Sequence, residues 1–231
     1  MKQVHRQAAQ DSETLRISLD TKAKVKIGDF SRGGESRGSE PVRAADHDMH
    51  PDAILTPAGI LEVDRNQLNV IFGTSRDTSD FVADSLELWW TNRQAAYPNV
   101  RRLLIDLDNG PEIASSRTQF MKRMVDFSDR HQLTLELAYY PPYHSKYNPI
   151  ERCWGILENH WNGALLSTIA TALAWAKTMT WRSVAPIVHT LEGVYQTGVR
   201  LTPRLFRPIA ARLLRSQLLH KWSLVIQPVT G

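Results

Sequence analysis

Residues 139–154 read YYPPYHSKYNPIERCW, and the interpretation of the whole fold depends on this stretch. An apolar run ends in a loop stiffened by two prolines, and the loop stops at Asn148-Pro149. Asn is favoured at a helix N-cap and Pro at the first helical position, so a helix is expected to begin at Pro149 with Glu151 in its first turn. The same spacing fits a capping box, in which Glu151 bonds back to the Asn148 backbone N–H. This stretch alone therefore leaves both a structural role and a metal or acid–base role open for Glu151.

The composition indicates a protein with one domain and a short appendage. The chain has 231 residues, of which 42% are hydrophobic, so it can bury one sizeable core. A single cysteine, Cys153, excludes an internal disulfide framework and a multi-cysteine zinc site, and we expect it to be a packed helix thiol. The first thirty residues hold no apolar signal segment, and no apolar run approaches the roughly 20 residues of a membrane span. We therefore expect a soluble, cytoplasmic protein without a membrane partner.

Positive charge is concentrated at the C-terminal end. The formal charge of the chain is only +4, but no acidic residue follows Glu192. The basic residues of that segment are Arg200, Arg204, Arg207, Arg212, Arg215 and Lys221. Such a segment suits either a polyanion such as DNA or a solvated helix face, and charge alone does not separate the two.

The first third of the chain has the pattern of β-hairpins. Residues 15–20 alternate apolar and polar side chains and end in Asp20, and residues 24–30 read as their hairpin partner. Residues 31–52 are rich in Gly, Pro, Ser and charge without periodicity, which predicts a long loop excursion. A second hairpin signal turns at Asp64–Gln67.

Helix and strand patterns alternate after the hairpins. Helical patterns cover residues 78–97, 118–130 and 149–161, and strand patterns cover 101–108 and 133–140. The resulting order β-β-β-α-β-α-β-α predicts an α/β fold with a mixed five-stranded sheet and helices on both faces. It is the order of the ribonuclease H-like fold, in which a central sheet gathers acidic residues around divalent metals.

Three regions are expected along the chain. Residues 1–14 would be an N-terminal remnant or linker, residues 15–200 the ribonuclease H-like domain, and residues 201–231 a basic helical extension. In that extension Pro208 can open a helix whose leucines pack while Arg212 and Arg215 face outward.

Three carboxylates stand where this order would bring them together. Asp20 ends the first strand, Asp108 ends the strand at 101–108, and Glu151 opens a helix. Carboxylates from separate elements suit Mg²⁺, and two such ions could drive phosphoryl transfer. Asp20 and Asp108 could instead be turn residues, since Asp favours turns. Asp106 shares a strand face with Asp108, so periodicity does not decide between them.

The amino-acid sequences of these segments resemble those of a known group of enzymes. IDLDNGPE and PPYHSKYNPIERCW are similar to the second and third carboxylate motifs of mariner-like transposases. SLDTKAKVKIGDFSRGG, SSRTQFMKRMVDF, YYPPYHSKYNPIERCWGILENHWNG and AKTMTW resemble a narrower bacterial insertion-sequence group, the Rhodopirellula transposase DDE domain family, over roughly residues 14–200. Ile113 departs from the pattern, because similar sequences carry an Asn after Gly-Pro-Glu.

This resemblance implies an activity, a metal and partners. Asp20, Asp108 and Glu151 would be a DDE triad holding Mg²⁺ or Mn²⁺, with two ions expected. The activity implied is metal-dependent DNA strand cleavage and strand transfer during transposition. The partners implied are the DNA of element ends and target, a second copy of the chain on DNA, and a separately encoded N-terminal helix-turn-helix portion. The protein would then be associated with the nucleoid.

Two other functions stay open. A truncated, catalytically silent remnant that binds DNA or oligomerises would keep the triad by descent. A stand-alone ribonuclease H-like nuclease is the further alternative.

Six side chains are candidate DNA contacts, because cationic and imidazole groups can meet phosphates. They are Lys22, Arg32, His144, Lys146, Arg212 and Arg215. Each has a structural alternative: lysines can protect a sheet edge, and a loop histidine can bond to the backbone.

Overall fold

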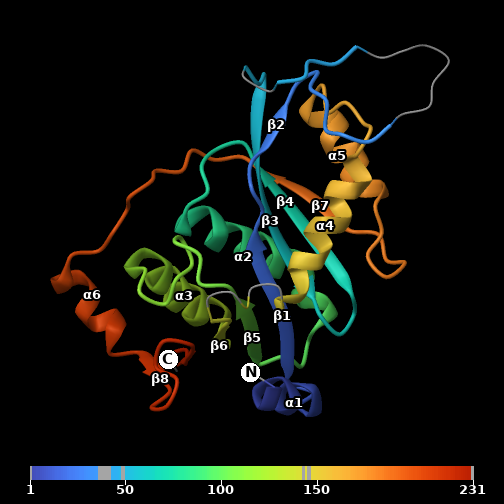
Figure 1. The fold of residues 1–231 in the computed structure, drawn as a ribbon. Helices are drawn as coiled ribbons and strands as arrows, with labels where there is room; N and C mark the ends of the chain where they lie inside the picture. The colour runs from blue at the N-terminus through green and yellow to red at the C-terminus, as the bar shows by residue number, and fades with distance from the viewer. Residues whose placement is uncertain (1, 36–42, 48–49, 142–143, 145–146, 230–231) are drawn as a thin grey trace.

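A computed structural model describes residues 2–35, 43–47, 50–141, 144 and 147–229 of the chain (Figure 1). Its strands are β1 (Thr14–Thr21), β2 (Val25–Ile27), β3 (Ala53–Glu62), β4 (Gln67–Gly73), β5 (Arg102–Leu107), β6 (Thr134–Tyr139), β7 (Ile187–Leu191), β8 (Leu213–Arg215) and β9 (Ser223–Ile226). Its helices are α1 (Lys2–Gln10), α2 (Ser79–Arg93), the short 3₁₀ helix η1 (Gln94–Ala96), α3 (Thr118–His131), α4 (Pro149–Trp161), α5 (Ile169–Thr178) and α6 (Pro203–Ala210). No helix in the described part of the chain is both long and apolar enough to cross a membrane.

All nine strands of the described chain join one mixed sheet. Its order is β7-β4-β3-β1-β5-β6-β9-β8, and β2 pairs with β3 off this path. β1 lies in the middle, antiparallel to β3 and parallel to β5. β6 continues the sheet parallel to β5. The carboxyl ends of β1 and β5 therefore lie at the same edge of the sheet.

Helices cover both faces of this sheet, as the alternating pattern predicts. Figure 1 shows α2 and α3 on one side of the strands and α4 and α5 on the other. Each pair closes its own apolar core: Trp89 and Phe120 lie in one, Trp161 and Phe72 in the other. Cys153 faces the second core, and burial raises the pKa of its thiol to about 12, which confirms a packed thiol.

The strand expectations are confirmed for the five central strands and wrong at the margins. Residues 24–30 do not pair with the first strand, because β2 pairs with β3 in the register Val25↔Leu55. This is possible because β3 is longer than its apolar signal and begins at Ala53, directly after the 31–52 excursion. The sheet also exceeds five strands, because β7 joins β4 at one edge and β9 joins β6 at the other.

The helical C-terminal extension is a second correction. Among the described residues of this extension only α6 is helical, with Pro208 inside it, and the chain then forms the β8–β9 hairpin. Leu224 and Ile226 of β9 enter the core beside α3, and their burial covers the otherwise open edge of β6. A pattern of single apolar residues within a short run gives no clear helix or strand period, so this pairing was not visible in the sequence.

The N-terminal segment, expected as a linker, contains helix α1. His5 of this helix reaches the Asp106 carboxylate at 2.9 Å between Nε2 and Oδ1. The segment is thereby tied to β5 in the centre of the sheet, while α1 itself lies beside the amino end of β1 (Figure 1).

Ile113, the residue that departs from the family pattern, packs into the core. It is 4% exposed, and its carbonyl accepts a hydrogen bond from the Tyr139 hydroxyl at 2.9 Å. The loop after β5 is therefore anchored to β6.

A buried carboxylate fastens α2 to the sheet. Glu62, at the end of β3, accepts hydrogen bonds from Arg93 Nε at 2.7 Å and from Trp89 Nε1 at 3.0 Å, and also from Tyr97. Burial alone would raise the pKa of Glu62, but these hydrogen bonds outweigh it and hold the pKa below its usual value. A carboxyl whose pKa is lowered in the folded state stabilises the fold above its unfolded pKa.

We expect Glu62→Gln to lower the free energy of unfolding by about 2–4 kcal/mol at neutral pH, because Arg93 loses its charged partner. The difference from wild type should narrow below about pH 4, as the native carboxylate becomes protonated. Urea denaturation at several pH values measures both. Glu136→Gln is the control, since its Arg102 partner is half exposed and the pair should contribute under about 1 kcal/mol. Equal losses in the two variants would contradict the role of Glu62.

Candidate active site

Strand register brings the first two carboxylates together. In the parallel pair β1–β5, Ser18 lies opposite Asp106 and Leu19 opposite Leu107. One further step along both strands sets Asp108 beside Asp20. Asp20 is 6% exposed, and Asp108 is half-buried at the start of the loop. The edge expected for the acidic residues is therefore where these two lie.

The third carboxylate is positioned by a hydrogen-bonded link between α4 and β1. The Ser18 hydroxyl donates to Asn148 Oδ1 at 2.5 Å and accepts from the Ile150 backbone N–H at 3.1 Å. Asn148 is the N-cap residue as expected, but its side chain makes no cap bond, and Ser18 satisfies the helix N–H instead. Glu151 follows Ile150 directly, so β1 sets where this side chain begins.

Glu151 is available at the site, and no capping box forms. Its carboxylate has no hydrogen-bond partner in the described chain, whereas its backbone N–H bonds to the Asn148 carbonyl at 3.1 Å. One turn further along α4, Trp154 Nε1 donates to Asp20 Oδ2 at 2.9 Å. α4 therefore supplies one carboxylate and orients another.

A glycine in β3 makes room for this contact. Gly59 lies opposite Asp20 in the β1–β3 register. A Cβ atom at Gly59 would lie 2.5 Å from the Trp154 ring and 2.7 Å from Ile150 Cδ1, closer than real contacts allow. The close approach of α4 to the sheet therefore requires glycine here.

The site concentrates negative charge. Burial raises the pKa of Asp20 to about 8, and the carboxylates of Asp108 and Glu151 add to the rise, against the hydrogen bond from Trp154. Burial and Asp108 also raise the pKa of Glu151. The carboxylate of Asp108 therefore lies close enough to both Asp20 and Glu151 to disfavour their charged forms.

The donor set suits a hard divalent ion. Carboxylate oxygens from several elements are the ligands that Mg²⁺ and Mn²⁺ take, and a cation would relieve the repulsion that raises these pKa values. Within the described residues, no group of three or more His, Cys, Asp or Glu is already drawn close enough to hold an ion. One Asp108 oxygen instead accepts the Gly110 N–H at 3.0 Å, so the turn expected at Asp108 also forms.

The two aspartates that periodicity left undecided differ in environment. Asp106 is fully buried, and Arg16 Nη2 lies 2.6 Å from its Oδ2 while His5 binds its other oxygen. Its charge is therefore compensated within the fold. Asp108 has no ion pair in the described part of the chain.

Three residues at the site were not visible in the sequence. Ser18 and Trp154 gave only the alternation and helical spacing of packed residues. Asp77 accepts from the Thr21 hydroxyl at 2.9 Å, and its other carboxylate oxygen is buried without a hydrogen-bond partner among the described residues. Burial raises the pKa of Asp77, with Glu112 and Asp108 adding to the rise. The one available signal was its position just before the N-cap residue Thr78.

Several candidate DNA contacts already bind protein groups. Lys22 pairs with Glu158 at 2.6 Å, and Arg32 donates to the Lys26 carbonyl and lies over the Trp161 ring. His144 is exposed and packs against the Tyr147 ring, whereas Lys146 lies outside the described residues.

The two C-terminal arginines do not face outward from a helix, contrary to expectation. Arg212 binds Asp129 at 2.5 Å and 2.6 Å through two guanidinium nitrogens. Arg215 donates to the backbone carbonyls of Ser115 and His220. Both are used to hold the β8–β9 hairpin against α3 and the loop after β5.

Comparisons with known proteins identify the relatives of this chain. The sequence model of the Rhodopirellula transposase DDE domain family matches residues 1–228. The solved Mos1 transposase paired-end complex with left transposon end has a TM-score of 0.52 and 8% identity, covering 75% of this chain and 50% of that chain. This likeness shows the ribonuclease H-like fold.

A simian T-cell lymphotropic virus intasome in complex with PP2A regulatory subunit B56 gamma has a TM-score of 0.43 and 14% identity, covering 69% of this chain and 45% of that chain. The chain thus spans about half the length of the solved chains it matches. A search of curated proteins gave no match.

We expect Ser18→Ala to lower the free energy of unfolding by about 1–3 kcal/mol, because Asn148 Oδ1 and the Ile150 N–H both lose a buried partner. Urea denaturation measures the loss. Ser85→Ala is the matched control, since Ser85 is equally buried but bonds only to a carbonyl of its own helix at 2.8 Å. A loss no larger than that of the control would contradict the link.

Gly59→Ala should cost about 1–3 kcal/mol, since the new methyl group pushes Trp154 and Ile150 away from the sheet. Near-ultraviolet circular dichroism should report the displaced indole ring. Gly155→Ala, beside Trp154 on α4, is the control: a Cβ there meets nothing within 4 Å, and alanine favours a helix by up to about 1 kcal/mol. Unchanged stability in Gly59→Ala would show that α4 does not need this close approach.

Proposed function

The chain belongs to the Rhodopirellula transposase DDE domain family, and from this premise we propose that it cleaves DNA strands and transfers them during transposition. One observation carries the proposal: Asp20, Asp108 and Glu151 come from three elements to one edge of the sheet, where burial and the neighbouring carboxylates raise the pKa values of Asp20 and Glu151. Such mutual repulsion in a polar edge site is typical of groups that serve chemistry rather than stability.

We assign Asp20, Asp108 and Glu151 as the ligands of Mg²⁺ or Mn²⁺. Two such ions, when bound, supply activation of the attacking hydroxyl and stabilisation of the leaving oxygen in phosphodiester cleavage. Asp108 is favoured over Asp106 as the second ligand, because Arg16 and His5 already compensate Asp106.

The residues around the triad have positioning roles. Trp154 donates its indole N–H to Asp20. This hydrogen bond orients the Asp20 carboxylate towards α4. Ser18 fixes the first turn of α4 and hence the starting point of Glu151. Neither group needs to touch the DNA.

DNA is the proposed substrate, at both element ends and target. The support is the family and the Mos1 structure, which is a paired-end complex with a transposon end. A homo-oligomer assembled on DNA belongs to the same proposal, and a separately encoded N-terminal portion stays a prediction.

We expect Glu151→Gln to reduce Mg²⁺-dependent cleavage and strand transfer by at least about a hundredfold, because the amide removes a charged ligand without changing the side-chain shape. Gel assays of nicking and joining on labelled DNA measure this, and a chelator should abolish the wild-type activity. Melting temperature and DNA affinity should stay close to wild type.

Glu13→Gln is the matched control, since Glu13 is exposed at the far end of β1 and should tolerate the same change. Full activity in Glu151→Gln would exclude Glu151 as a ligand. Salt-sensitive DNA binding by a wild-type chain that never nicks DNA would favour the silent remnant, and cleavage of an RNA–DNA hybrid alone would favour a ribonuclease H-like nuclease.

A further inference from the structure

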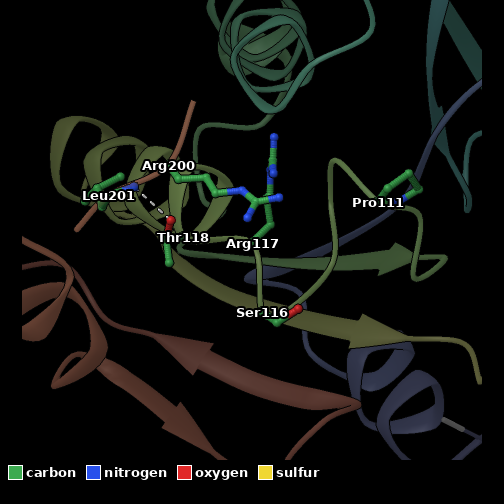
Figure 2. Close-up of a pocket in the computed structure, with 6 residues that line it drawn as sticks. All are labelled: Pro111, Ser116, Arg117, Thr118, Arg200 and Leu201. Carbon is green, nitrogen blue, oxygen red and sulfur yellow. Dashed lines mark hydrogen bonds between the residues drawn. The ribbon is translucent and has the colours of Figure 1, made fainter. Parts of the chain in front are cut away.

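A pocket of about 410 Å³ lies where the loop after β5 enters α3. It is lined by Pro111, Ser116, Arg117, Thr118, Arg200 and Leu201. The first four residues follow the β5 strand that ends beside Asp108, and the last two belong to the segment that crosses from β7 to α6. Figure 2 shows the Arg200 and Arg117 side chains among the residues that line it. Two segments distant in sequence therefore build the pocket.

The two arginines differ in how far their charge is compensated. Arg117 pairs with Glu112 at 3.0 Å, and its Nε lies 3.4 Å from the Ser79 hydroxyl. Arg200 is exposed and has no hydrogen-bond or ion-pair partner in the described chain. Two guanidinium groups and one carboxylate leave a net positive charge at the pocket, so an anion would be attracted there.

The helix end at the pocket adds to this attraction. α3 begins without a side-chain cap and has no acidic residue in its first turn. Its free N–H groups and the hydroxyls of Ser116 and Thr118 are donors of the kind that bind phosphate oxygens. The Thr118 hydroxyl already accepts the Leu201 N–H at 3.0 Å, which holds the two walls together (Figure 2).

The pocket is also fixed in place. Arg215 donates to the Ser115 carbonyl at 2.6 Å, and the Ser115 hydroxyl donates to the Lys221 carbonyl at 3.1 Å. The β8–β9 hairpin thereby braces the loop that carries Ser116 and Arg117. A binding site with rigid walls loses less entropy when it is filled.

We propose that this pocket binds a backbone phosphate of the DNA substrate, with Arg200 as the principal contact. The proposal rests on the proposed function, since it takes DNA as the substrate. Two further exposed arginines, Arg204 and Arg207, follow Arg200 in the chain on α6, which packs on α3.

The test is DNA affinity measured without catalysis. Fluorescence anisotropy of a labelled duplex in the presence of a chelator, over a series of salt concentrations, compares wild type with Arg200→Ala. Loss of one phosphate contact should reduce the slope of log affinity against log salt by about 0.9 and weaken binding about fivefold to tenfold near 0.1 M salt. Arg117→Ala is less informative, because it also removes the ion-pair partner of Glu112.

Ser116→Glu is a second variant that adds a negative charge at an exposed position lining the pocket, and it should weaken binding as well. Arg6→Ala is the matched control: Arg6 is an exposed arginine on α1, at the opposite end of β1, and its loss should leave affinity and slope unchanged. Equal affinity and slope in wild type, Arg200→Ala and Ser116→Glu would overturn the proposal.

Calorimetric titration with inorganic phosphate separates the two sources of the anion. If Arg200→Ala lost phosphate binding but kept the duplex affinity and salt slope, the pocket would be a site for free phosphate and the proposal would be wrong. Because the chelator removes any dependence on the triad, this result is independent of whether Glu151→Gln cleaves DNA. The failure of one proposal can thus be told from the failure of the other.

Discussion

The hydrogen bonds of the Ser18 hydroxyl are the constraint on which the site depends. Ser18 lies two residues before Asp20 on β1 and binds both the cap residue and the first-turn N–H of α4. A strand and a helix separated by 130 residues of chain thereby meet in one fixed register. The link is fully buried, so its donor and acceptor, if they separated inside the fold, would be left without either each other or water as a partner. The place of Glu151 therefore follows from β1 rather than from the loop before it.

Within the described residues, the carboxylates of the site form no ion pair, whereas other buried carboxylates of the sheet do. Asp106, two residues before Asp108 on the same strand face, pairs with Arg16 and binds the His5 ring, and Glu62 pairs with Arg93. Asp20 has an indole N–H instead, and burial and its neighbours raise its pKa. Carboxylates that repel one another destabilise a fold unless a cation joins them. The two apolar cores and the Glu62 network supply stability elsewhere in the sheet.

The sequence was sufficient where the signal was local. The apolar strand ending at Asp108 and the Asn-Pro start of α4 each carry their own pattern, and both form as expected. The sequence did not predict which strands pair when they are distant in the chain. β2 pairs with β3 because β3 extends beyond its apolar run, and β9 pairs with β6, whose edge would otherwise be open. Periodicity says which face a residue occupies but not which partner it meets. For this reason Asp106 and Asp108 looked alike until Arg16 and His5 were placed beside one of them.

The loop from Asp108 to Arg117 joins the two charged regions at a fixed separation. At its start, Asp108 accepts the Gly110 N–H; in its middle, the Ile113 carbonyl is held by Tyr139; near its end, the Ser115 carbonyl is held by Arg215. Each bond restrains a different point of the loop, so the carboxylates at one end and the arginines at the other cannot move independently. A nucleic-acid strand carries its phosphates at regular intervals, and a rigid spacing between the cationic pocket and the proposed metal-binding edge would select one phosphodiester for the edge once another is held in the pocket. The basic C-terminal segment would then act in two ways: Arg215 sets the spacing through the backbone, and Arg200 supplies the charge.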